Sequence, residues 1–125
     1  MLFDTDVLIW IQRGNQNAAD VLDAQSDRMI SVLTYMELLQ SASDKRQHRV
    51  ILSFLKQCGI MTLPLTENIG HRATIYIEEY TLSHGIRAAD AIIAATAVEN
   101  GIAFCSANRK HFSPIQELDF RHFSP

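Results

Sequence analysis

The sequence has few cysteines: only two of its 125 residues, Cys58 and Cys105. They lie far apart and lack the close spacing of metal-binding cysteines. Two cysteines in a chain with ample apolar material predict buried, reduced thiols rather than a disulfide scaffold. Nothing in their spacing indicates a disulfide, so we expect a reducing compartment.

A long hydrophobic run is also missing. The longest apolar stretch, residues 91–98 (AIIAATAV), is far shorter than the roughly 20 residues that a membrane-spanning helix needs. The first residues lack a basic segment and include an acid as early as Asp4, unlike a signal peptide. By elimination we expect a cytoplasmic protein that does not contact a membrane.

Positive charge is scarce: 11 Lys and Arg stand against 14 Asp and Glu, giving a formal net charge of −3. This composition excludes a polybasic nucleic-acid binder. Any contact with RNA or DNA must therefore come from a local patch or from a bound metal.

Apolar residues are plentiful, at 47% of the chain against 20% charged residues. This balance predicts a folded core rather than disorder. The length is close to the commonest domain size, and no internal repeat, linker or low-complexity tract divides the chain. We therefore expect residues 1–125 to form a single domain.

Short apolar segments alternate with segments of helical periodicity. Predicted strands cover residues 2–3, 29–33, 60–65, 103–106 and 118–123. A first predicted helix begins with residues 7–11. Further predicted helices cover residues 18–24, 34–42, 44–58, 66–84 and 90–100. Strands separated by helices of this length pair in parallel. The predicted fold class is α/β: a three-layer α/β/α sandwich with a short parallel central sheet.

Polar residues lie where these strands end. Asp4 follows the first strand, Glu37 is expected in the first turn of the helix after the second, and Asp90 is expected at the start of a helix. Ser106 and Asn108 end and follow the fourth strand. Because ligands of parallel α/β folds gather at the carboxyl edge of the sheet, we expect these side chains to converge on one pocket.

Each of these residues also fits a structural role. Thr34 and Glu37 have the spacing of a capping box, in which the acid bonds back to the cap residue. Asp90 fits a first-turn acid favoured by the helix dipole, Asp4 fits a helix cap, and Asn108 fits a turn residue. Taken singly, each position leaves both interpretations open.

Taken together, the three acids favour a metal ion. Carboxylates about 4 Å apart repel by roughly 4 kcal/mol per pair at an effective dielectric near 20. No Lys or Arg adjoins Asp4 or Glu37 in the sequence to offset this repulsion. Mg²⁺, or Mn²⁺ in its place, suits a site of few carboxylates because it keeps several waters and accepts phosphate oxygens. Such sites support phosphoryl chemistry, in which the metal activates water.

Four segments occur in the order of one family's motifs: LFDTDVLIW, ISVLTYMELLQS, AADAIIAATAVENGI and FCSANRKHF. From residue 2 to about 113 they resemble the PIN domain, and most of all the VapC-type toxins of bacterial toxin–antitoxin pairs. DAIIAATA followed by Asn100 and Gly101 is the most specific part. The resemblance implies a PIN-like fold, a metal-dependent endoribonuclease acting on RNA, a homodimer and inhibition by a cognate antitoxin protein.

The resemblance also implies roles for residues of the first three motifs. Asp4, Glu37 and Asp90 match the family's three principal acids, which makes them the expected metal ligands and catalytic residues. Thr5 matches the hydroxyl residue that follows the first acid. Asp6 falls at a variable position and is expected to support the loop rather than bind metal.

In the last motif, Ser106 is expected to support the site. Asn108, which is counted among the expected catalytic residues, takes the place of a fourth acid found in many relatives. Because an amide is a poorer ligand than a carboxylate, the sequence leaves one metal or two open. Arg87, Arg109 and Lys110 flank the same edge and are candidate contacts for RNA phosphates, although solvated surface charge explains each equally well.

His111 follows these basic residues and fits either a role in placing substrate or water or an incidental loop position. The resemblance further suggests that residues 32–39, with the helix around 50–55, form a groove for an antitoxin peptide. Which RNA is cut is left open by the sequence.

Two other functions fit parts of the pattern. Asp4 and Asp6 share their spacing with the opening motif of haloacid dehalogenase-type phosphatases. However, Leu8 stands where that motif has Thr or Val, and a late Asp pair is missing. The other is a PIN-fold binding module that is catalytically weakened and regulated by a partner protein, which Asn108 favours.

Overall fold

The structure is a computed structural model that describes all 125 residues. In chain order its elements are β1 (Leu2–Phe3), α1 (Thr5–Gln12), α2 (Gln16–Asp23), β2 (Met29–Ser31), α3 (Val32–Gln40), α4 (Lys45–Gln57), β3 (Met61–Leu63), α5 (Glu67–His84), α6 (Ala88–Glu99), β4 (Phe104–Ser106), α7 (Arg109–Phe112) and β5 (Phe120–His122).

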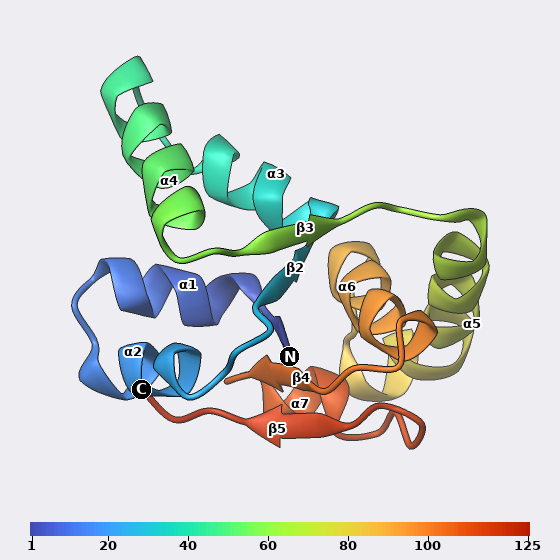
Figure 1. The fold of residues 1–125 in the computed structure, drawn as a ribbon. Helices are drawn as coiled ribbons and strands as arrows, with labels where there is room; N and C mark the ends of the chain where they lie inside the picture. Colours follow the sequence, from blue (N-terminus) through green and yellow to red (C-terminus); the bar gives the residue numbers. More distant parts are fainter.

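The five strands form one sheet in the order β3-β2-β1-β4-β5, and every pairing is parallel. β1, although it has only two residues, lies at the centre, with Leu2 beside both Met29 and Phe104. Helices α1 to α4 lie on one side and α5 and α6 on the other (Figure 1). The predicted α/β/α sandwich with a short parallel sheet is therefore confirmed.

Successive side chains of the central strands point to opposite faces of the sheet. Leu2 and Phe104 are fully buried against α5 and α6, while their neighbours Phe3 and Cys105 are buried against α1 to α4. One short strand pair thus anchors both cores and holds the strand ends in register. The rings of Phe104 and Phe112 pack edge to face, with their centroids 4.8 Å apart. This contact holds α7 against the sheet.

Both cysteines are free thiols, as the sequence predicted, but the prediction that both are buried is wrong for Cys58, which is partly exposed at the end of α4. Cys105 lies in the core, and burial together with the nearby Asp6 and Asp4 raises its pKa to about 12. No helix combines the length and apolar character needed to cross a membrane.

The second strand is shorter than predicted, and this changes the position of Glu37. β2 ends at Ser31, whose Oγ accepts the backbone N–H of Leu33 at 3.1 Å and caps α3. The capping box predicted for Thr34 and Glu37 is therefore wrong. Thr34 is fully buried within α3, and Glu37 lies in its second turn rather than its first.

Two features in the second half of the chain also differ from the prediction: the start of α6 and the presence of α7. α6 begins at Ala88 rather than at residue 90, so Asp90 is its third residue. The four-residue helix α7 was not predicted, because so short a segment carries no periodicity.

Candidate active site

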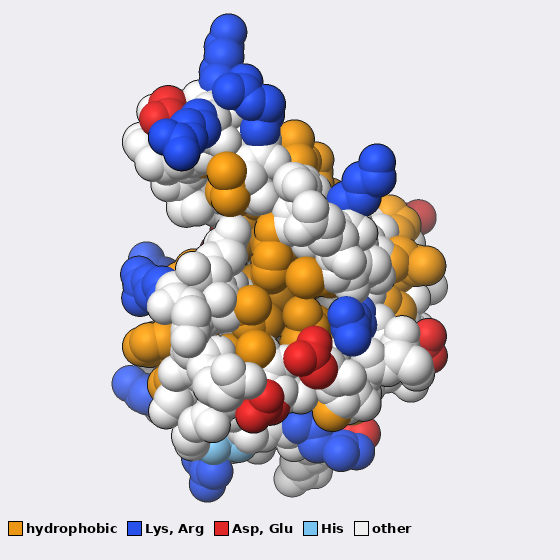
Figure 2. All heavy atoms as spheres, turned by 60° about the vertical axis from the view of Figure 1, so that its left-hand side comes forward, with side chains coloured by type: hydrophobic (Ala, Val, Ile, Leu, Met, Phe, Trp, Pro, Cys, Tyr) orange, Lys and Arg blue, Asp and Glu red, His pale blue; other side chains and the backbone are white.

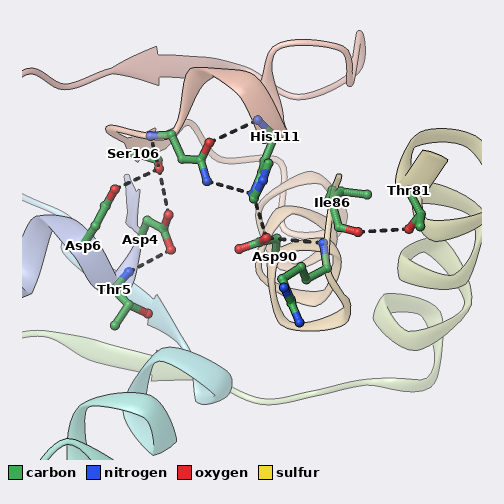
Figure 3. A network of polar contacts seen from close by, with 10 residues as sticks. Asp4, Thr5, Asp6, Thr81, Ile86, Asp90, Ser106 and His111 are labelled. Atoms are coloured by element: carbon green, nitrogen blue, oxygen red, sulfur yellow. Dashed lines mark hydrogen bonds and ion pairs between the residues drawn. The ribbon is translucent and has the colours of Figure 1, made fainter. Parts of the chain in front are cut away.

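Asp4 lies at the centre of the candidate site, where β1 ends and α1 begins. Its Oδ1 accepts the backbone N–H of Thr5 at 2.8 Å, and its Oδ2 accepts the hydroxyl of Ser106 at 2.7 Å. Ser106 ends the neighbouring strand β4. The parallel pairing of β1 with β4 thus brings together two residues that are far apart in the sequence (Figure 3).

The surroundings of Asp4 are unfavourable for a carboxylate. Asp4 is only 7% exposed, and this burial raises the pKa of its carboxyl group to about 7. The negative charges of Asp6 and, to a smaller extent, Asp90 act in the same direction, against the hydrogen bonds from Ser106 and Thr5. Asp4 forms no ion pair with any basic side chain of the chain. A bound cation would supply the missing positive charge.

Asp6, in the first turn of α1, faces the end of β4. Its Oδ2 accepts the backbone N–H of Ala107 at 3.0 Å and lies 3.4 Å from the Ser106 hydroxyl. Its Oδ1 is buried and has no hydrogen-bond partner. Burial raises the pKa of Asp6 as well. The side chain ties α1 to the loop after β4 and adds negative charge beside Asp4.

Glu37 reaches the site through a hydroxyl group. The Thr5 hydroxyl donates to Glu37 Oε1 at 2.7 Å and lies 3.0 Å from the hydroxyl of Thr34. Glu37 makes no hydrogen bond to Asp4 or Asp90, so the structure places it at the border of the site, with Thr5 between it and Asp4.

Asp90 sits opposite Asp4, and the two carboxylates point toward one another in Figure 3. Its Oδ2 accepts the backbone N–H of Arg87 at 3.3 Å and lies 2.9 Å from His111 Nδ1, while its Oδ1 takes no hydrogen bond. Asp90 therefore does accept a backbone hydrogen bond at the start of α6, as a first-turn acid would, but this bond uses only one of its two carboxylate oxygens.

Asn108 turns its side chain toward His111 rather than toward the acids. Its Oδ1 accepts the backbone N–H of His111 at 3.2 Å, and its Nδ2 lies 2.8 Å from His111 Nδ1. Its backbone N–H donates to Ser106 Oγ at 3.0 Å. The amide therefore caps α7 through Oδ1, and its Nδ2 lies against the imidazole.

The sequence left the role of His111 open, and the structure places its ring within the site. Asn108 precedes it by three residues, which is the spacing of an N-cap and its partner. That signal was readable in the sequence, whereas the contact with Asp90 was not, because it joins separate elements.

Three exposed basic residues lie on the rim. Arg87 precedes α6, and Arg109 and Lys110 form the first turn of α7. None of them is held in an ion pair with an acidic side chain. Their charges are therefore available to an anionic ligand at the edge where Asp4 and Asp90 meet.

The donor set fits a hard divalent cation, although no three His, Cys, Asp or Glu side chains are gathered into a ready-made metal cluster. The oxygens on offer are carboxylate oxygens, which Mg²⁺ prefers. The buried, unpaired charge of Asp4 and the free Oδ1 of Asp90 are the observations that support this fit.

A second feature is a hollow on the face that carries α4. It has a volume of about 460 Å³ and lies between Gln12 of α1, the turn after α3, and α4 with Arg46, Val50 and Ile51. Figure 2 shows hydrophobic side chains in a hollow below the basic residues at the top of the molecule, where α4 lies.

The PIN domain family model matches residues 1–118 of the chain. No curated protein matches the chain in sequence. Among solved structures, a chain of a toxin-antitoxin complex from Klebsiella pneumoniae is 27% identical with a TM-score of 0.79, over 94% of this chain and 93% of that one.

A chain of FitAcB from Neisseria gonorrhoeae is 26% identical with a TM-score of 0.72, over 99% of this chain and 96% of that one. A chain of VapBC2 from Rickettsia felis, solved bound to a DNA fragment from the promoter, has a TM-score of 0.80 at 19% identity, over 98% of both chains. At that identity the likeness shows the fold alone.

Proposed function

Because this chain belongs to the PIN-domain family, we propose that it is a Mg²⁺-dependent endoribonuclease, the toxin of a toxin–antitoxin pair, that hydrolyses RNA phosphodiester bonds. The observation that carries the proposal is the carboxylate of Asp4, which is buried without a basic partner and faces Asp90. Asp4 and Asp90 are the proposed metal ligands, and Glu37 is the proposed third acid.

When bound, Mg²⁺ or Mn²⁺ would activate a water and offset negative charge on the phosphate. The chain's own residues hold the ligands in place. Ser106 and the Thr5 amide orient Asp4, and the Thr5 hydroxyl orients Glu37. The proposal assigns Asp6 to supporting the loop after β4.

RNA would meet the rim formed by Arg87, Arg109 and Lys110. An acidic protein repels a polyanion, so phosphate contacts from unpaired basic side chains are needed beside the metal. Because the three side chains are exposed and free of ion pairs, they can move onto the backbone of a bound strand without first breaking a contact.

The direct test is cleavage mapping of RNA by the purified protein with Mg²⁺, with Mn²⁺ and with EDTA. We expect cleavage with either metal, none with EDTA, and none from D4N or D90N. E78Q, which removes an exposed acid of α5, is the matched control and should cleave like the parent. Cleavage in EDTA, or full activity of D4N and D90N, would refute the metal site.

The proposed protein partner is an antitoxin, because the neighbours from Klebsiella pneumoniae and Neisseria gonorrhoeae, at above 25% identity, include a named toxin-antitoxin complex. The hollow beside α4 is the proposed docking site. Val50 is 57% exposed there, and α4 carries four basic residues and no acid. Of these four, Arg46 lines the hollow itself, together with Asp44, the N-cap of α4. This combination fits a partner segment with apolar and acidic side chains. By family resemblance we also propose a homodimer.

One alternative retains support from a specific observation. The side chain of Asn108 is occupied by His111, so no fourth acid or amide is turned to the metal. A PIN-fold binding module that does not cleave would fit this arrangement. Binding of RNA and metal without cleavage would favour it. The phosphatase considered from the sequence is not supported, since the family match is to the PIN domain.

A further inference from the structure

The imidazole of His111 joins two parts of the candidate site that no motif connects. Its Nδ1 lies 2.9 Å from Asp90 Oδ2 on α6 and 2.8 Å from Asn108 Nδ2 at the start of α7 (Figure 3). The side chain is 21% exposed, and its Nε2 takes no hydrogen bond from the chain. The ring is therefore held by one nitrogen only.

That nitrogen cannot satisfy both neighbours at once. The amide Nδ2 of Asn108 is only a donor, a carboxylate is only an acceptor, and Nδ1 carries either one proton or one lone pair. A lone pair on Nδ1 at 2.9 Å from a carboxylate oxygen would be repelled. An N–H on Nδ1 in turn opposes the Asn108 amide hydrogens, but a hydrogen bond to the charged carboxylate is the stronger of the two interactions. Nδ1 therefore donates to Asp90, and Asn108 holds His111 chiefly through its Oδ1, which accepts the His111 backbone N–H.

A continuous series of contacts then runs from Asp4 to Asp90. Asp4 Oδ2 accepts from Ser106 Oγ at 2.7 Å, Ser106 Oγ accepts from Asn108 N at 3.0 Å, and Asn108 Oδ1 accepts from His111 N at 3.2 Å. The bond from His111 Nδ1 to Asp90 completes it. No other hydrogen bond joins α7 to Asp90, so His111 is the link on which this connection depends.

We propose that His111 is a positioning residue for Asp90: its Nδ1–H holds Oδ2, which leaves Oδ1 turned toward Asp4. The inference rests on the proposed function, because it takes Asp90 to be a metal ligand. Groups that hydrogen-bond a metal-ligating side chain fix its orientation, and their loss typically weakens metal affinity 10- to 100-fold. His111 thereby orients Asp90 from the part of the site where Asn108 stands in place of a fourth acid.

Two isosteric variants separate the ring nitrogens. In H111N the amide nitrogen occupies the place of Nδ1 and can donate to Asp90, whereas in H111Q it occupies the place of Nε2 and cannot. H111A removes both. All three keep the backbone N–H that Asn108 accepts, so the cap of α7 is retained. H71A, which removes an exposed histidine of α5, is the matched control.

The readout is the dissociation constant of Mn²⁺ alone, measured by isothermal titration calorimetry on the full chain, with thermal melting in EDTA to check folding. We expect H111A and H111Q to weaken Mn²⁺ binding about 10-fold. H111N and H71A should stay close to the parent. RNA cleavage at saturating and limiting Mn²⁺ should follow the same order, with the larger losses at limiting metal.

Equal affinity of H111A and the parent would overturn the inference, as would H111N binding no better than H111Q. If H111A does not fold, the comparison of H111N with H111Q decides. A parent protein that binds no Mn²⁺, or a D90N variant that binds it as tightly as the parent, would overturn the proposed metal site itself. Binding that is lost in D90N and unchanged in H111A would overturn only the role of His111.

Discussion

Ser106 donates its hydroxyl hydrogen bond to Asp4 at 2.7 Å across a separation of 102 positions in the sequence. The contact follows from the register of the sheet, in which Phe3 lies opposite Cys105 and the next residue of each strand faces the other. The acid at the centre of the site is thus oriented by strand pairing rather than by its own loop.

Replacing Asp4 should stabilise the metal-free protein at alkaline pH. Burial raises the pKa of this carboxyl from 3.8 to about 7, so the unfolded chain loses the proton near pH 4 while the native state keeps it. Native stability therefore falls as pH rises through this window, and the penalty is complete above it. The difference is worth up to about 4 kcal/mol.

We expect D4N to melt several degrees above the parent in EDTA at pH 8, and the gap to close near pH 4. Differential scanning calorimetry at both pH values measures it, with D20N, an exposed acid of α2, as control. A D4N protein that melts at or below the parent temperature at pH 8 would show that the buried charge is already compensated.

Mg²⁺ should stabilise the parent more at pH 8 than at pH 5.5. At the lower pH, Asp4 keeps its proton in the native state, so metal binding must first release it. Thermal shift against MgCl₂ at constant ionic strength measures the effect, and D4N should show little shift at either pH. An equal shift in D4N would place the ion elsewhere.

The Thr5 hydroxyl should matter through Glu37. T5V removes the donor at 2.7 Å and leaves the glutamate free to turn, while T5S keeps the donor. We expect T5V to lose about 1 kcal/mol of stability. RNA cleavage should fall in T5V but stay near the parent rate in T5S. If T5V cleaves as well as T5S, the orientation of Glu37 is not set by this bond.

The basic rim should contribute to RNA affinity without altering metal affinity. For each phosphate contact removed, the slope of log affinity against log salt should decrease by about 0.7 for single-stranded RNA. Fluorescence anisotropy with a single-stranded oligonucleotide, in Ca²⁺ or with D90N to limit cleavage, compares R87A and the R109A/K110A pair. R121A, a basic residue that is already paired with Asp119, is the control. Unchanged slopes in R87A and in R109A/K110A would show that these side chains do not contact RNA phosphates.

The hollow beside α4 should respond to charge as well as to shape. V50D places an acid among the basic residues of α4 and should weaken capture of the product of an adjacent small gene, while RNA cleavage by the free protein is retained. K56Q lies on the same helix but outside the hollow and serves as control. Retained capture by V50D would move the partner site to another face.

The sequence predicted that Asp4, Glu37, Asp90, Ser106 and Asn108 converge, because strand ends of a parallel sheet meet at one edge whatever the local details. Asp4, Asp90 and Ser106 do lie together, whereas Glu37 reaches only Thr5 and the Asn108 side chain turns to His111. The sequence did not predict where α3 begins. Ser31 and Thr34 both offer a capping hydroxyl, and only the pairing of Ser31 with Leu63 on the neighbouring strand decides between them. Local capping signals cannot resolve a choice that tertiary pairing makes.

The same limit applied to His111. Its contact with Asp90 spans 21 positions and depends on how α7 packs through Phe112, so no spacing rule in the chain reports it. The direction of the Asn108 amide could not be predicted for the same reason. Its side chain caps α7, a helix too short to be predicted, and is therefore turned away from the acids.

The central place of β1 has a consequence for synthesis on the ribosome. Asp4, which follows β1, is made some hundred residues before Ser106 of the partner strand β4. A nascent chain that has not yet exposed β4 holds the first acid without the hydroxyl that orients it. The candidate site is thus completed only once β4 has followed β1 out of the ribosome, so the strand pairing that defines the sheet also sets when its central acid is oriented.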